Sequence, residues 1–138
     1  MIKKEHKILL KKKESDLRIY NKELGIARIS ELIGRLTDKI DGCPWDKVQT
    51  NSTLAKYTIE EAYELAESVE RQSSVETCKE LGDLLFNILF HIHISTEKGL
   101  FTLDNVIDET INKMVSRHPH VFGGKKISNI DEVNTQWE

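Results

Sequence analysis

This 138-residue sequence is poor in residues that break or staple a chain, with only two prolines, two cysteines and 7% aromatics. Two cysteines without metal-site spacing fit neither a disulfide scaffold nor a zinc site, so we expect Cys43 and Cys78 to be reduced and structural. No apolar run approaches the length of a membrane span, and the Lys-rich start lacks the apolar core of a secretory signal. We therefore expect a cytoplasmic protein without a membrane partner.

The charge is unevenly distributed along the chain. Residues 1–23 hold eight Lys or Arg against four acidic residues, a net +4, which leaves −7 on residues 24–138 because the total is −3. We therefore divide the chain into a basic N-terminal extension, 1–23, and a single domain, 24–138. A basic arm can touch nucleic acid, but a solvated, frayed terminus is the commoner explanation, and the acidic body argues against a nucleic-acid partner.

No strand-like alternation stands out, and the apolar periodicity is helical wherever it is strong. Turn residues from Gly42 onward end the first helix, Ser73 with Glu76 has the form of a capping box, and Pro119 stops the last helix. The expected helices are 24–40, 54–71, 74–98 and 102–118. Four helices with short connections predict an all-α, four-helix-bundle-like fold. A small core and an almost wholly apolar third helix favour a homodimer or a dimer of dimers.

The third helix carries one polar stripe on an otherwise apolar surface. Its members, at helical spacing on a single face, are Glu80, Asp83, Asn87 and His91. Ionised carboxylates on a helix too apolar to be a surface need a cationic partner, because burying them alone is costly.

The second helix places three carboxylates, Glu60, Glu61 and Glu64, within about one turn. A Glu-rich face is often simply solvated, and that explanation suffices for Glu67. The second acidic pair, Glu80 and Asp83 on the third helix, favours a metal site over a solvated face, since two packed helices can surround one space with carboxylates. An all-oxygen ligand set suits Mg²⁺ or Mn²⁺ and points to phosphoryl or nucleotidyl chemistry, with Glu60 free to orient or deprotonate water.

A phosphate-bearing substrate also needs cations. Lys113 and Arg117 lie at i and i+4 on the fourth helix and suit polyphosphate oxygens. As two exposed cations near a helix C-terminus, they are explained equally well by the helix dipole. Asn87, on the polar stripe, is a further candidate for substrate binding.

Four ordered segments carry a resemblance to a known family. GCPWDKVQT, YTIEEAYEL, KELGDLLFNILF and KMVSRHPHVFGG resemble, in order and spacing, the signature of MazG-type nucleoside triphosphate pyrophosphohydrolases over residues 29–138. The resemblance implies an all-α, dimeric enzyme that uses Mg²⁺ to cleave an NTP or dNTP to the monophosphate and pyrophosphate, in housecleaning of the nucleotide pool.

The resemblance also implies residue roles. Glu61, Glu64, Glu80 and Asp83 correspond to the Mg²⁺ ligands, and Glu60 to the acidic residue that assists them. Lys113, Arg117 and Trp137 correspond to phosphate and base contacts; Trp45 has a base-stacking and a packing explanation of equal weight. His118 and His120 are expected to be structural.

The sequence departs from the family pattern at three places: Asn51 replaces a frequent His, Ser116 replaces a frequent Arg, and the sequence stops at Glu138, where relatives usually continue with a Lys-bearing helix. The last two remove positive charge near the polyphosphate.

Two alternatives remain open. Related all-α hydrolases act on dUTP, modified dCTP or phosphoribosyl-ATP, and the acidic cluster alone does not separate them. A catalytically weak or silent helical dimer that binds nucleotides or a partner protein is the alternative from another class.

Overall fold

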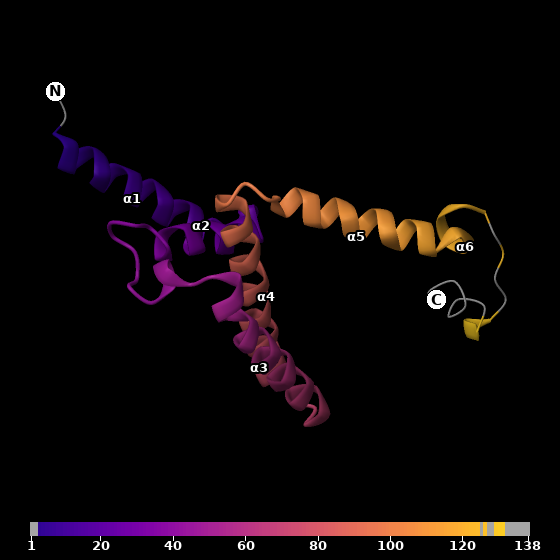
Figure 1. The fold of residues 1–138 in the computed structure, drawn as a ribbon. Coiled ribbons are helices and arrows are strands. Elements are labelled where there is room, and N and C mark those ends of the chain that lie inside the picture. The colour runs from indigo at the N-terminus through magenta and orange to yellow at the C-terminus, as the bar shows by residue number, and fades with distance from the viewer. Residues whose placement is uncertain (1–2, 125, 127–128, 132–138) are drawn as a thin grey trace. The chain divides into compact units, whose positions relative to one another are not determined.

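The computed structural model describes residues 3–124, 126 and 129–131, and every regular element among them is helical, as predicted (Figure 1). The α-helices are α1 (Lys4–Tyr20), α2 (Ala27–Leu36), α3 (Asn51–Glu70), α4 (Ser74–Glu97), α5 (Leu103–Arg117) and the short α6 (Pro119–Phe122). Two 3₁₀ turns, η1 (Lys22–Leu24) and η2 (Asp46–Val48), lie between them. None of the described helices combines the length and apolarity needed to cross a bilayer.

The chain divides into two compact units, one ending at Leu100 and one beginning at Phe101. Each is described by itself. The first unit holds α1 to α4, and the second holds α5 and α6.

Side-chain caps set where α3 and α4 begin. The Thr50 hydroxyl accepts the Thr53 N–H at 3.1 Å and the Thr53 hydroxyl accepts the Thr50 N–H at 2.8 Å, so α3 begins at Asn51, three residues before the predicted start. Ser73 accepts the Glu76 N–H at 3.3 Å and begins α4, as predicted. Beyond the end of α4, Gly99 has φ +73°, a backbone conformation that glycine adopts without strain.

Helices α3 and α4 form an antiparallel hairpin, and its seam organises the first unit (Figure 1). The buried apolar residues include Leu54 of α3 with Leu89 and Phe90 of α4. Helix α2 packs on α4, Ile33 of α2 is fully buried, and Thr37 Oγ1 lies 3.0 Å from His93 Nε2 of α4. The hairpin therefore fixes the relative register of the two acidic helices.

The apolar surface of α4 is only partly covered within the single chain. Leu81, Leu85 and Ile88 are 51%, 36% and 42% exposed. The almost wholly apolar third helix of the sequence analysis is therefore covered on the side that faces α3 and α2, and not at these three residues.

Two predictions for the N-terminal part of the unit are wrong. The first predicted helix ends at Leu36 rather than near Gly42, because the Asp38 carboxylate accepts the Ile40 and Asp41 N–H groups at 2.9 Å and forms a turn; Ile40 is 87% exposed. The N-terminal segment is not frayed but forms α1, which packs on α2. Two ion pairs tie it to α2, Arg18–Glu31 and Arg35–Asp16, and a third, Lys12–Asp41, joins it to the turn after α2.

The second unit begins where the sequence predicts. Thr102 and Asn105 form a reciprocal cap at the start of α5, which ends at Arg117. Pro119 does not simply end the helix, since it occupies the first position of α6.

Candidate metal centre

Three carboxylates meet across the α3–α4 seam. Glu61 and Glu64 come from α3 and Glu80 from α4, and one oxygen of each lies within 4.8 Å of the others. The i, i+3 spacing puts the two α3 residues on one side of that helix, and the antiparallel register brings Glu80 opposite them. The structure thus brings together three of the four predicted ligands, in the part of the chain that it describes.

The cluster is electrostatically unfavourable as it stands. Desolvation raises the pKa of Glu61 above its ordinary 4.5, and the charges of Glu64, Asp83 and Glu80 raise it further. Desolvation also raises the pKa of Glu80, followed by the charge and hydrogen bonding of Glu64. Glu61 and Glu80 therefore resist ionisation, first because they are desolvated and then because of the neighbouring negative charges.

Two oxygens of the cluster are buried without a partner. Oε2 of Glu61 and Oε2 of Glu80 accept no hydrogen bond from the described residues. Buried polar atoms are normally satisfied, so an orphaned pair in a like-charged cluster calls for a ligand. A hard cation fits this site, because every donor is an oxygen and a positive charge would relieve both the repulsion and the missing hydrogen bonds.

The other two acidic candidates, Asp83 and Glu60, differ in their relation to this cluster. Asp83 is exposed, yet its charge raises the pKa of both Glu61 and Glu80, so its carboxylate acts on the same space. Glu60 is exposed on α3 and is not one of the three grouped carboxylates.

The stripe of α4 continues from the cluster as neutral polar groups. Asn87 is 6% exposed, and its Oδ1 accepts a 2.6 Å hydrogen bond from the Thr58 hydroxyl. His91 lies between Thr58 and Asn51, with its Nε2 2.8 Å from the Thr58 hydroxyl and its Nδ1 3.0 Å from Asn51 Nδ2. Sequence reasoning singled out Asn87, His91 and, as a departure from the family pattern, Asn51, but it missed Thr58. The signal for Thr58 was its place three residues before Glu61, on the same face of α3.

Trp45 is half exposed in the loop before α3. Its ring meets the Tyr57 ring edge to face at a centroid distance of 5.8 Å. The Nζ atom of Lys56 lies 5.0 Å from the centroid of the same Tyr57 ring. Both proposed roles, base stacking and packing, are compatible with a ring that packs on one edge and remains exposed elsewhere.

The candidate phosphate-binding residues lie in the second unit. Lys113 is exposed on α5 and Arg117 is half-buried at its end. His118 Nδ1 lies 2.6 Å from the Met114 carbonyl oxygen, a contact that fits the structural role expected for this histidine. Trp137 lies outside the described residues.

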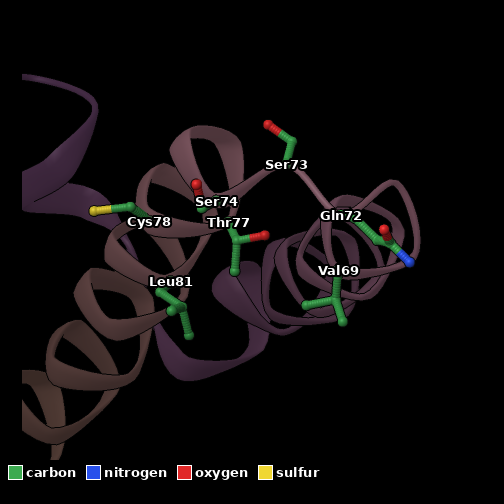
Figure 2. Close-up of a pocket in the computed structure, with 7 residues that line it drawn as sticks. All are labelled: Val69, Gln72, Ser73, Ser74, Thr77, Cys78 and Leu81. Carbon is green, nitrogen blue, oxygen red and sulfur yellow. The ribbon is translucent and has the colours of Figure 1, made fainter.

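A separate hollow opens at the tip of the hairpin (Figure 2). It measures about 490 Å³ and holds none of the clustered carboxylates. Its lining is Val69, Gln72, Ser73, Ser74, Thr77, Cys78 and Leu81. Cys43 and Cys78 are both free, in line with the expectation that they are reduced, and the thiol of Cys78 is exposed at this hollow.

Comparison with known proteins gives a consistent result. The family model of the MazG nucleotide pyrophosphohydrolase domain matches residues 49–122. The chain is 40% identical over 113 residues to the nucleoside triphosphate pyrophosphohydrolase of Escherichia coli strain K12, covering 82% of this chain and 43% of that protein.

Two further relatives show the same pattern. The nucleoside triphosphate pyrophosphohydrolase/pyrophosphatase MazG of Thermotoga maritima is 42% identical over 105 residues, covering 74% and 40% of the two chains. The uncharacterised protein YabN of Bacillus subtilis strain 168 is 45% identical over 98 residues, covering 71% and 20%. The chain thus spans less than half the length of each of these three relatives.

The matched region runs from the loop before α3 to the end of α6 and contains all the clustered carboxylates. The chain belongs to the MazG nucleotide pyrophosphohydrolase family.

Proposed function

We propose that this protein hydrolyses nucleoside triphosphates, NTP or dNTP, to the monophosphate and pyrophosphate, with Mg²⁺ as its cofactor and removal of unwanted nucleotides as its role. The observation that carries the proposal is the cluster of Glu61, Glu64 and Glu80 with its two orphaned buried oxygens. The names of the Escherichia coli and Thermotoga maritima relatives support the same substrate class. We also propose a cytoplasmic location, because nucleoside triphosphates are found there.

Four residues would hold the cation: Glu61, Glu64, Glu80 and Asp83. Carboxylate ligands favour Mg²⁺, and Mn²⁺ would fit the same oxygens. A bound Mg²⁺ supplies positive charge for the substrate phosphates and lowers the pKa of water. The protein's own contribution is to hold four carboxylates from two helices in one register, so that little rearrangement is needed when the substrate arrives.

The proposed reaction is an attack of water on the α-phosphorus. A bond forms between the water oxygen and the α-phosphorus, and the bond from that phosphorus to the bridging oxygen breaks, so that pyrophosphate leaves. Glu60 takes the proton of the attacking water. Its exposed position, next to Glu61 in the sequence, suits this role, since a base must exchange its proton with solvent after each turnover.

Other residues would hold the substrate. We propose Lys113 and Arg117 for the polyphosphate, Trp45 and Trp137 for the base, and Asn87 as a neutral donor deeper in the seam. The domain that does this spans residues 24–138, and α1 lies in the extension that precedes it.

We propose a homodimer or a dimer of dimers as the working form. Support comes from the uncovered apolar side chains of α4, Leu81, Leu85 and Ile88, which a second copy would bury. Sedimentation velocity at micromolar concentration is expected to show at least a dimer, and a Leu85→Lys variant is expected to shift it toward monomer. A fully active monomeric wild type would contradict this proposal.

The test of the function is a screen of all NTPs and dNTPs with Mg²⁺ that resolves pyrophosphate from orthophosphate. We expect pyrophosphate and monophosphate in equal amounts, and no turnover with EDTA. Orthophosphate and a nucleoside diphosphate as the main products would refute the proposed cleavage site. Absence of turnover with every nucleotide would favour a silent nucleotide-binding dimer.

A further inference from the structure

The backbone of Trp45, in the loop before α3, is held by a side-chain amide. Gln49 Nε2 donates to the Trp45 carbonyl oxygen at 2.9 Å, and Gln49 Oε1 accepts the Thr53 hydroxyl at 2.7 Å. The Trp45 carbonyl oxygen can only accept, so the amide nitrogen must face it, and the amide oxygen is then left for Thr53. The two bonds therefore fix one orientation of the Gln49 amide and link Trp45 to the first turn of α3.

The ring of Trp45 is held by Tyr57, one helical turn after Thr53 on α3. The two ring centroids lie 5.8 Å apart at an interplanar angle of 70°, the edge-to-face arrangement that aromatic pairs prefer. Lys56 Nζ lies 5.0 Å from the Tyr57 ring centroid, a distance at which a cation and an aromatic ring attract each other. Tyr57 is half-buried by these neighbours, whereas Trp45 keeps 50% of its surface exposed.

The loop that carries Trp45 is also closed tightly where it begins. The Gly42 N–H donates to the Asp38 carbonyl at 2.9 Å, and the Cys43 N–H donates to the Leu36 carbonyl at 2.8 Å. A Cβ on Gly42 would collide with both of these carbonyl oxygens, so this turn requires glycine. An exposed ring in a loop that is bonded at both ends is preorganised, and a flat ligand that stacks on it loses little affinity to ordering.

The Trp45 ring packs on the turn of α3 that precedes the acidic cluster. Tyr57 and Glu61 are four residues apart on this helix, so they share one face and lie about 6 Å apart along its axis. A nucleoside triphosphate is longer than one helical turn. Phosphates bound to a cation at Glu61 and a base stacked on Trp45 can therefore belong to one molecule.

We propose that Tyr57 and Gln49 are positioning residues that hold Trp45 as a preformed stacking surface for the nucleobase. The inference rests on the proposed function, in which Trp45 contacts the base. Every base has a flat face that can stack on an aromatic ring. Loss of either positioning residue should therefore weaken ligands that carry a base and spare ligands that consist of phosphate alone. A purely structural role would weaken both kinds of ligand.

The first experiment measures two constants with Mg²⁺: the KM of the nucleoside triphosphate with the highest turnover, and the inhibition constant of inorganic tripolyphosphate, which lacks a base. In Tyr57→Leu we expect KM to rise roughly 10-fold, within the range for one base–aromatic stack, while kcat and the inhibition constant stay unchanged. Gln49→Leu should show the same split. Tyr57→Phe, which keeps the ring, and Tyr63→Leu, which removes a 74% exposed tyrosine of the same helix, should match the wild type.

Equal weakening of the nucleotide and of tripolyphosphate in Tyr57→Leu would assign this tyrosine to the fold of the loop and overturn the proposal. Unchanged values of both constants would overturn it as well.

The second experiment needs no turnover. The sequence has two tryptophans, so in a Trp137→Phe background the fluorescence reports Trp45 alone. With Mg²⁺ present, we expect nucleoside triphosphates to protect this fluorescence from quenching by acrylamide, and tripolyphosphate to leave it accessible. Tyr57→Leu should lose the protection at the same nucleotide concentration. Protection in a protein that hydrolyses no nucleotide would refute the proposed reaction and support the stacking surface, whereas turnover without protection would overturn the stacking surface alone.

Discussion

The two halves of the α3–α4 seam bury polar groups in opposite ways. In the hydrogen-bonded half, Asn51, Thr58, Asn87 and His91 are neutral and are linked at 2.6–3.2 Å. In the acidic half, Glu61, Glu64 and Glu80 are like-charged, and two of their oxygens have no partner among the described residues. Both halves lie on the same two helices in the same register.

The difference therefore does not come from the backbone. The hydrogen-bonded half shows that this seam can pair polar side chains with one another. The acidic half is left unsatisfied by its choice of residues, and such a local conflict is typical of a binding or catalytic site rather than of a core. The comparison indicates that the acidic half is completed by a ligand.

The largest expected effect comes from Glu64→Gln, which removes one charge from the acidic half and keeps its shape. If the cluster binds the cation, kcat at saturating Mg²⁺ should fall by at least about 100-fold. Mutating residues that only hydrogen-bond to metal ligands already costs up to about 100-fold in affinity or activity, and a ligand itself should matter more. Steady-state kinetics with a pyrophosphate readout measures this.

The matched control is Glu70→Gln, which changes an exposed glutamate at the end of the same helix. It should leave kcat unchanged. A Glu64→Gln enzyme with near wild-type kcat would remove the cluster from the mechanism and leave the contrast between the two halves without a functional meaning.

Lys113→Ala tests the proposed role of Lys113 in binding the polyphosphate, in contrast to the acidic residues proposed to bind the cation. A lysine that contacts polyphosphate equally in the ground and transition states contributes uniform binding, so its loss raises KM more than it lowers kcat. A hydrogen bond to a charged group is worth about 1.5–3 kcal/mol, so KM should rise about 10-fold or more. Lys98→Ala, at the end of α4, is the control. A fall in kcat at unchanged KM would assign Lys113 to the transition state instead.

Much of this site could be predicted from sequence because helical spacing is local. The i, i+3 positions of Glu61 and Glu64, and the apolar surroundings of Glu80, fix which face each carboxylate occupies. Glu61, Glu64 and Glu80 lie near one another in the structure, and their role as metal ligands stays a prediction.

The parts that sequence reasoning missed depend on contacts between distant residues. Thr58 is unremarkable in the chain, and only the register of α3 against α4 brings it to Asn87 and His91. Likewise, α1 has few apolar residues at helical spacing, and its pairing of Arg18 with Glu31 of α2 cannot be inferred from either segment alone. Ile40 fits a helical period, but the Asp38 turn overrides it.

The pH dependence of stability should distinguish the acidic half in the metal-free protein. The folded-state pKa values of Glu61 and Glu80 lie above their ordinary 4.5. The folded state therefore binds more protons than the unfolded state, and the contribution of these groups to stability is lost as pH rises from 4.5 through the raised values. Glu31 and Asp38 have lowered pKa values and act in the opposite direction, so the total curve mixes both signs.

Glu64→Gln separates the two contributions because it leaves Glu31 and Asp38 untouched. The melting temperature of the variant minus that of the wild type, measured without metal, should increase as pH rises above 4.5. Saturating Mg²⁺ should reverse the order, since the wild type gains binding energy that the variant lacks. A difference that is flat with pH would mean that the cluster is not strained.

The smallest expected effect concerns charges that are already paired at the surface. Arg35 Nη1 lies 2.6 Å from Asp16 Oδ1 and ties α2 to α1, with the two side chains 35% and 57% exposed. Solvent screens such a pair, and ordering two long side chains opposes the attraction, so the coupling energy should be below about 1 kcal/mol. A double-mutant cycle of Arg35→Ala and Asp16→Ala, by urea denaturation at low and high salt, measures it.

The coupling should shrink as salt rises, because the Debye length falls from about 10 Å at 0.1 M to about 3 Å at 1 M. The backbone part of the contact, from Arg35 to the Lys12 carbonyl at 3.4 Å, is lost in both arginine variants and cancels in the cycle. A coupling energy of several kcal/mol that is independent of salt would contradict this prediction. It would show that this exposed ion pair stabilises the protein as a buried pair does.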